Sequence, residues 1–264
     1  MQKKSKVAGV FSGLVILLAL IAGQLIYWFL LRSPGNFVDN NPDNDPVNIL
    51  GTMAKGGPAI VPILIGFLLI VITVSFERFL TIAKARGAGD ISGFVKRIQY
   101  NLANNDVDAA IAECDKQKGS VANVVRSGLE TYGKMRGETA MARDQKVLAI
   151  QKEVEESTSL ELPMLEKNLY IVATLAPLGT LTGLIGTVIG MIRAFQAMGH
   201  AGAPDAAGLA VGISEALVNT ALGILTSILA IILYNYFTQQ IDGLTYGIDE
   251  AGYSIAQNFA EHYK

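Results

Sequence analysis

The sequence predicts an all-α integral membrane protein with four transmembrane helices and a helical cytoplasmic domain. Hydrophobic residues make up 51% of the 264-residue chain and charged residues only 17%, which is unusually apolar for a soluble chain of this length. Four stretches reach the about 20 mainly apolar residues that a spanning helix needs. Between the second and the third of them lies a charged segment that carries helix start signals.

The four apolar stretches are roughly 7–31, 59–76, 169–192 and 209–237. Three Lys precede the first stretch, and 14 Lys and Arg lie between the second and the third. Since cytoplasmic loops are enriched in Lys and Arg, both termini and the large charged segment are expected on the cytoplasmic side. Residues 1–31 resemble a signal peptide in their basic start. Their apolar run of about 25 residues exceeds a normal signal and no cleavage site follows, which favours an uncleaved helix over a removed leader.

These spans divide the chain into eight predicted segments. They are an N-terminal transmembrane helix at 1–32, a periplasmic loop with an interfacial helix at 33–58, a transmembrane helix at 59–79, a cytoplasmic helical domain at 80–167, a transmembrane helix at 168–195, a short periplasmic loop at 196–208, a transmembrane helix at 209–237, and a cytoplasmic tail at 238–264.

The charged segment reads as several helices, because good N-cap residues precede amphipathic runs. Gly119 and Gly137 are plausible stops, and a last helix from about 139 runs toward the third span with a bend expected at Pro163. The candidate N-caps are Asp90 or Ser92, Asn105 or Asp106, and Ser120.

Composition and motifs argue against an enzyme and against a nucleic-acid partner. The net charge is only −2, and the single cysteine, Cys114, cannot form an internal disulfide. No phosphate-binding glycine loop and no metal-ligand cluster occur, and the two histidines, His200 and His262, read as surface residues. We therefore expect no cofactor and no metal.

A glycine stripe marks the third span as a helix that packs closely against another helix. Such a smooth face lets two backbones approach, and close packing of small residues holds helices together in lipid. Pro177 predicts a local kink that frees the Ala173 carbonyl. The stripe, at i, i+4, i+7 and i+11, consists of Gly179, Gly183, Gly186 and Gly190.

Polar side chains in the third and fourth spans mark a candidate ion pathway. Hydroxyls recur seven residues apart in both spans, and a second stripe in the fourth span includes a carboxylate, which is costly in a membrane and normally faces water or a bundle interior. A role for Glu215 in bonding to Asn219 or to a neighbouring helix is equally open at this point. The candidates are Thr180 and Thr187 in the third span, and Thr220, Ser227, Glu215 and Asn219 in the fourth. Gly223 and Thr226 complete the stripe that contains Glu215 and Asn219.

Some of these polar side chains are expected at similar depths in the membrane. With a rise of about 1.5 Å per residue, Thr187 and Glu215 lie at similar depths, and Thr220 lies slightly deeper. Two helices of one chain cannot enclose a pore, so several copies of the chain are needed.

Several segments resemble the ExbB/TolQ/MotA group of ion-driven motor subunits. The third and fourth spans, LAPLGTLTGLIGTVIGMIRAF and GISEALVNTALGILTSILAIILYNYF, look like its paired signature. The segments GGPAIVPILIGFLLIVITVSFERF and CDKQKGSVANVVRSGLE resemble the helix that opens the ExbB and TolQ core and their cytoplasmic loop. The likeness covers about 50–240. The first 50 residues depart from it, because they add a helix to the usual three spans.

The resemblance implies a homopentamer in the lipids of the bacterial inner membrane, in which two helices per subunit line a pore. That pore surrounds an ExbD-like single-span partner dimer whose membrane Asp binds and releases H⁺ or Na⁺. Thr187 and Thr220 match the family's polar rings facing this Asp, and Glu215 matches its carboxylate near the path. Asn219 stands where a small residue is more usual. A TonB-like energy transducer then delivers the work to outer-membrane transport.

Three alternatives stay open beside the ExbB-like reading. A TolQ-like role in envelope integrity shares the same motifs. A MotA-like stator also has four spans with both termini inside, although the motifs and the short tail look closer to ExbB and TolQ. A passive scaffold needs only the glycine stripe.

Overall fold

The computed structural model of the protein describes residues 2–199 and 205–263. The chain divides into two compact units, one formed by Met1–Phe76 and Asn168–Tyr234, the other by Glu77–Lys167 and Asn235–Lys264. His200 and the middle of the predicted loop at 196–208 lie outside the described residues.

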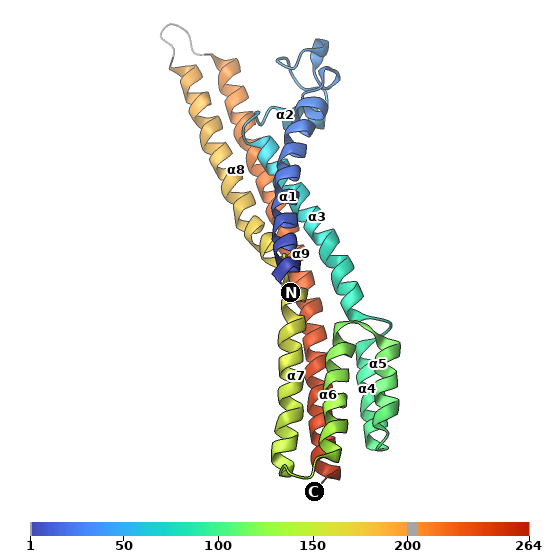
Figure 1. The fold of residues 1–264 in the computed structure, drawn as a ribbon. Coiled ribbons are helices and arrows are strands. Elements are labelled where there is room, and N and C mark those ends of the chain that lie inside the picture. Colours follow the sequence, from blue (N-terminus) through green and yellow to red (C-terminus); the bar gives the residue numbers. More distant parts are fainter. Residues whose placement is uncertain (1, 200–204, 264) are drawn as a thin grey trace. The chain divides into compact units, whose positions relative to one another are not determined.

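The first unit contains the apolar helices, as predicted (Figure 1). Its elements are α1 (Gln2–Leu25), the π-helical segment η1 (Ile26–Leu31), α2 (Ile49–Ala54), the first part of α3 (Val61–Arg86), α8 (Leu169–Met198) and the first part of α9 (Ala206–His262). The described residues hold four helical runs long and apolar enough to cross a membrane, namely Gly13–Leu31, Val61–Ala103, Arg143–Met198 and Ala206–His262. The protein is therefore an all-helical, multi-pass membrane protein.

The segment expected as a loop at 33–58 is folded by short-range hydrogen bonds. It comprises the 3₁₀ turns η2 (Pro34–Asn36) and η3 (Val38–Asn40), one antiparallel bridge between Phe37 and Pro46, and α2. Asn48 caps α2, because its side-chain oxygen accepts from the Gly51 amide at 3.0 Å. A short helix thus forms in the predicted segment, and its place at a membrane surface stays a prediction.

Apolar packing joins α1, α3, α8 and α9 in the first unit. One buried cluster includes Val71 of α3, Val172 of α8 and Ala230 of α9. A second cluster joins Tyr27 and Leu31 of η1 to Val61 of α3, among others. The additional N-terminal helix is therefore packed into this unit.

The second unit is a helical bundle in which two of the predicted caps are confirmed. It contains α4 (Ile91–Ala103), α5 (Val107–Gln117), α6 (Gly119–Gly137), α7 (Arg143–Glu166) and the remaining parts of α3 and α9. Asp90 accepts from the Gly93 amide and Asp106 from the Ala109 amide, both at 2.9 Å.

The prediction that Ser120 caps the third cytoplasmic helix is wrong. Helix α6 begins at Gly119, and Lys118 occupies the cap position with a φ of +57°. Gly119 has a φ of +82°, and its backbone packs against that of Ala85 at the end of α3. This close backbone approach, which only glycine permits, fixes the start of α6 before Ser120.

The segment predicted as a cytoplasmic tail at 238–264 is helical, and its place in the cytoplasm stays a prediction. Helix α9 continues without a break to His262, and its later part belongs to the second unit. The Tyr132 hydroxyl of α6 donates to Oδ1 of Asn258 at 2.8 Å, and Nδ2 of Asn258 donates to the Leu102 carbonyl at 3.0 Å. The buried side chains of this part are Ile241, Leu244, Ile248, Ala251, Ile255 and Phe259. Their helical spacing makes this part an amphipathic core helix.

A buried arginine of α3 binds the carbonyl groups at the C-terminal end of α7. Arg78 of α3 is 2% exposed and donates to the carbonyls of Met164 and Leu165 at 3.3 and 3.1 Å. These carbonyls lie in the last turn of α7, where a cation is favourable. The helix expected to run toward the third span therefore ends at Glu166, and Asn168, with a φ of +65°, precedes α8. Pro163 lies inside α7, and its expected bend stays a prediction.

Cys114 is expected to resist alkylation in the folded protein at pH 8. The side chain is 3% exposed, and burial raises the pKa of its thiol from 9.0 to about 12. The thiol stays protonated below that pKa, so at pH 8 the thiolate fraction is about a thousandfold smaller than at the ordinary pKa. Iodoacetamide labelling followed by mass spectrometry, with and without denaturant, measures this difference. Equal labelling rates in both conditions would contradict the burial of Cys114.

Candidate functional site

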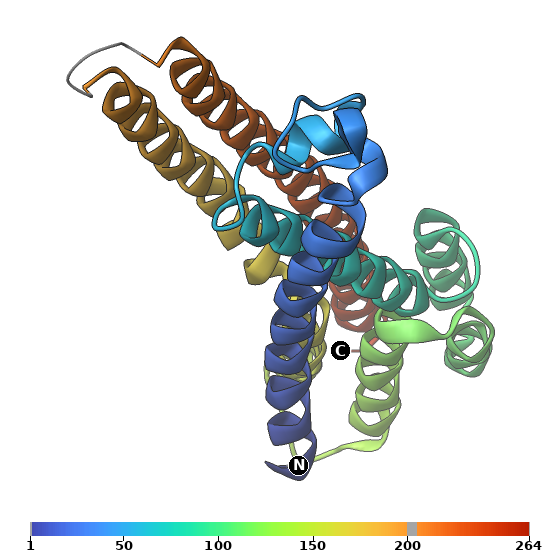
Figure 2. The ribbon, with the colours of Figure 1, turned by 90° about the horizontal axis from the view of Figure 1, so that it is seen from above.

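A glycine seam joins α8 to α9 in the first unit. The two helices lie side by side in both ribbon views (Figure 1, Figure 2). A Cβ atom added to Gly183 would stand 3.1 Å from Cα of Gly223, and one added to Gly190 would stand 2.7 Å from the amide nitrogen of Ala216. All four glycines of the predicted stripe are buried and face α9, namely Gly179, Gly183, Gly186 and Gly190. The backbones of α8 and α9 therefore touch.

Hydroxyl groups pair across this seam at two levels. Thr180 and Ser227 are hydrogen-bonded at 2.7 Å, and Thr187 and Thr220 are hydrogen-bonded to each other. Thr187 also donates to the Gly183 carbonyl of its own helix at 3.2 Å. Thr180 is exposed, while Thr187 and Thr220 are half-buried. The pairs therefore lie along an edge of the seam that another helix can reach.

Pro177 lies inside α8, less than one turn before Thr180. Helix α8 continues through it, and the hydroxyl of Ser227 donates to the Ala176 carbonyl. The kink and the freed Ala173 carbonyl that the sequence predicts at Pro177 stay predictions. Thr226 donates to the Leu222 carbonyl of its own helix at 2.9 Å.

Glu215 is buried and forms an ion pair with Arg193 of α8. The side chain of Glu215 is 7% exposed and that of Arg193 is 51% exposed. Burying a carboxylate is costly unless a counter-charge is present, and the guanidinium supplies it. Of the two partners that the sequence offered for a bonding role of Glu215, a neighbouring helix is thus observed, whereas Asn219 is not.

Asn219 is fully buried and stands apart from the hydroxyl pairs. Neither polar atom of its side chain has a hydrogen-bond partner among the described residues. A Cβ atom added to Gly186 would stand 2.5 Å from Cβ of Asn219, so the amide fills space over the glycine seam. The predicted site therefore consists of two hydroxyl pairs, in which Ser227 is buried and the three threonines are half-buried or exposed, and of two buried polar side chains, Glu215 and Asn219.

Sequence reasoning missed three residues around Glu215 and Asn219. It assigned no role to Arg193, and it did not single out Gly56 and Gly57, whose turn packs against Asn219 and Glu215. The paired glycines before the second apolar stretch were a usable signal, because consecutive glycines mark close backbone approach.

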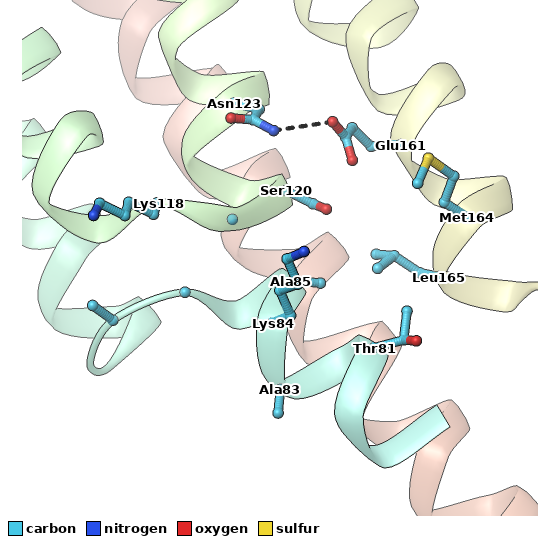
Figure 3. A pocket seen from close by; sticks show the side chains of 13 residues that line it. Thr81, Ala83, Lys84, Ala85, Lys118, Ser120, Asn123, Glu161, Met164 and Leu165 are labelled. Carbon is cyan, nitrogen blue, oxygen red and sulfur yellow. Dashed lines mark hydrogen bonds between the residues drawn. The ribbon is translucent and has the colours of Figure 1, made fainter. Parts of the chain in front are cut away.

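The second unit contains a separate cavity of about 800 Å³. Figure 3 shows Thr81 and Lys84 of α3, Ser120 of α6 and Leu165 of α7 at its wall. The Asn123 amide donates to Glu161 across it at 3.2 Å. The described residues contain no group of three or more His, Cys, Asp or Glu that could hold a metal ion.

Comparison with known proteins places these features in a family. The profile of the MotA/TolQ/ExbB proton channel family matches residues 116–250, which include α6, α7, α8 and most of α9.

Individual relatives agree with this match. The ExbB-like 3 protein of Synechocystis sp. is 37% identical over 86 residues, which cover 32% of this chain and 41% of that protein. The Tol-Pal system protein TolQ of Pseudomonas aeruginosa is 29% identical over 124 residues, or 47% of this chain and 54% of that one. The biopolymer transport protein ExbB of Aquifex aeolicus is 39% identical over 77 residues, or 29% and 52%. The chain spans about half the length of these curated relatives. With the family profile matching just over half of its length, the chain belongs to the MotA/TolQ/ExbB proton channel family.

Proposed function

We propose that this chain is an ExbB-like subunit of an inner-membrane motor driven by the ion-motive force. The observation that carries the proposal is the Thr187–Thr220 hydroxyl pair at the edge of a glycine seam between two apolar helices. Hydroxyls donate or accept a hydrogen bond as a nearby group changes its charge, and they add no fixed charge that would trap an ion.

The working complex has five copies of the chain in this proposal. Helices α8 and α9 of each copy turn the edge with Thr187 and Thr220 toward a central pore. An ExbD-like dimer occupies that pore, and its membrane Asp exchanges H⁺ or Na⁺ near the hydroxyls. Both termini and the second unit lie in the cytoplasm, in line with the 14 Lys and Arg at 77–167.

The energy for work comes from the ion gradient. One charge that moves through about 100 mV releases about 2.3 kcal/mol, so a sizeable pull needs several ions. A TonB-like transducer passes this work to outer-membrane transport. A TolQ-like role in envelope integrity is the second candidate, favoured by the likeness to the Pseudomonas aeruginosa TolQ over 47% of this chain.

Native mass spectrometry of the complex, extracted gently from its own membranes, tests the proposal. Five copies that retain a small single-span protein with a membrane Asp are the expected result. A monomer or dimer without such a partner would overturn it and leave a scaffold held by the glycine seam. In a deletion strain, loss of substrate uptake would identify the ExbB-like role, and envelope leakage with normal uptake would identify the TolQ-like role.

A further inference from the structure

Glu215 lies directly under the turn that joins α2 to α3. Gly57 in this turn has a φ of +93°, and a Cβ atom added to it would stand 2.5 Å from Oε1 of Glu215 and 3.7 Å from Nη1 of Arg193. Both the backbone angle and the lack of space favour glycine at this position. The turn therefore rests on the Glu215–Arg193 ion pair.

Gly56 makes a second contact with α9. A Cβ atom added to Gly56 would stand 2.9 Å from Cγ1 of Val218 and 3.0 Å from Oδ1 of Asn219. Glu215 and Asn219 are four residues apart and so lie on one face of α9. Two consecutive glycines thus cover two successive turns of this helix, and neither leaves room for a side chain.

Tyr27 lies in the N-terminal extension, which is the first 50 residues of the chain, and it contacts this turn. Its side chain is 2% exposed, and its hydroxyl donates to the Ala54 carbonyl at 3.2 Å. The same carbonyl accepts the Gly57 amide at 3.1 Å. The hydroxyl of the extension and the amide above Glu215 therefore share one acceptor.

Asn36 holds the other end of α2. Its side-chain amide donates to the carbonyls of Leu30 and Leu31, at 2.7 and 2.9 Å, and its oxygen accepts from Asn48 at 2.9 Å. Asn48 in turn caps α2. Both ends of α2 are thus bonded to η1, which lies at the end of the first helix.

We propose that the N-terminal extension positions the Glu215 carboxylate. Segment η1 fixes α2, α2 fixes the turn at Gly57, and this turn together with Arg193 holds the carboxylate against α8. Tyr27, Gly57 and Arg193 are thus positioning residues for Glu215, which stays ion-paired and does not carry the transported ion. That this positioning matters for ion-driven work rests on the proposed function. The contacts from Tyr27 to Glu215 are independent of it.

Hydrogen–deuterium exchange of the complex in nanodiscs tests the chain of contacts. The variants are Tyr27→Phe, which removes only the hydroxyl, and Gly57→Ala. Gly35→Ala is the matched control, because a Cβ atom there meets nothing within 4 Å. We expect exchange in the peptides 54–60 and 212–220 to rise about fivefold in both variants and to stay unchanged in the control. Unchanged exchange in the peptide 212–220 of the folded Tyr27→Phe variant would overturn the proposal. This outcome decides the test even if the Gly57→Ala variant fails to fold.

Substrate uptake by cells tests the positioning role of Arg193. Arg193→Gln is expected to lower uptake about tenfold, because it leaves Glu215 buried without its cation, and Arg193→Lys is expected to retain most of it. If wild-type cells take up substrate and cells with the Arg193→Gln variant take it up equally fast, the positioning role is wrong while the motor function stands. If the wild-type chain supports no uptake, the motor function fails, and the exchange experiment alone decides the inference.

Discussion

Replacing Thr187 or Thr220 with valine is expected to abolish energised uptake while the complex still assembles. Valine has nearly the shape of threonine but has no hydroxyl. Since the two hydroxyls bond to each other, either single replacement also leaves its partner without that bond. The lost hydrogen bond itself costs only about 0.5–1.5 kcal/mol, which leaves assembly intact. The loss of uptake is expected because the proposed function needs both hydroxyls to exchange hydrogen bonds with the ion-binding Asp of the partner.

Because the two hydroxyls act as one unit, the two replacements should not be additive. The double variant Thr187→Val with Thr220→Val is expected to be about as defective as either single variant. Proton leak in vesicles that contain the partner protein measures the same effect without a transported substrate. A leak that needs the partner and is lost in the Thr187→Val variant would separate a motor from a scaffold.

Thr174→Val is the matched control for these variants. Thr174 lies on α8 with Thr187 and is exposed, and among the described residues its hydroxyl bonds only to the Tyr170 carbonyl, at 2.7 Å. Its replacement removes a hydroxyl of the same kind outside the seam, so uptake should stay near the wild-type level. Normal uptake in both the Thr187→Val and the Thr220→Val variants would exclude these hydroxyls from the ion path.

The pairing of the hydroxyls was within reach of the sequence. Thr180 and Thr187 are seven residues apart, as are Thr220 and Ser227. When two such helices run antiparallel, equal spacing brings both pairs into register, and the structure pairs Thr180 with Ser227 and Thr187 with Thr220. Periodicity within each helix, together with short connections, was therefore sufficient for this part of the site.

The surroundings of Glu215 could not be predicted in the same way. Its cation belongs to another helix, and the turn above it lies far away in the sequence, between α2 and α3. A pattern within one helix does not specify which distant backbone packs on it. By contrast, the buried stripe of α9 beyond residue 237 was visible in the sequence as a helical repeat of apolar residues.

A single methyl group at Gly223 is expected to weaken the α8–α9 pair. A Cβ atom there would stand 2.6 Å from the Gly179 carbonyl oxygen and 2.9 Å from Cα of Gly183. Both atoms belong to the backbone of α8, so no side chain can move aside, and the two helices must separate. Overpacking of this kind costs about 1–3 kcal/mol. In lipid the helices have no hydrophobic drive that would restore the contact.

Gly243→Ala provides the control with the opposite sign. Gly243 lies on the same helix, and a Cβ atom there meets nothing within 4 Å. Alanine is favoured over glycine in a helix by about 1 kcal/mol, so this replacement should raise the thermal midpoint of unfolding while Gly223→Ala lowers it. Circular dichroism of both variants in nanodiscs measures the two shifts. If Gly223→Ala also raised the midpoint, the backbones of α8 and α9 could not be in contact, and the hydroxyl pairs at the edge of the seam would lose the geometry that brings them together.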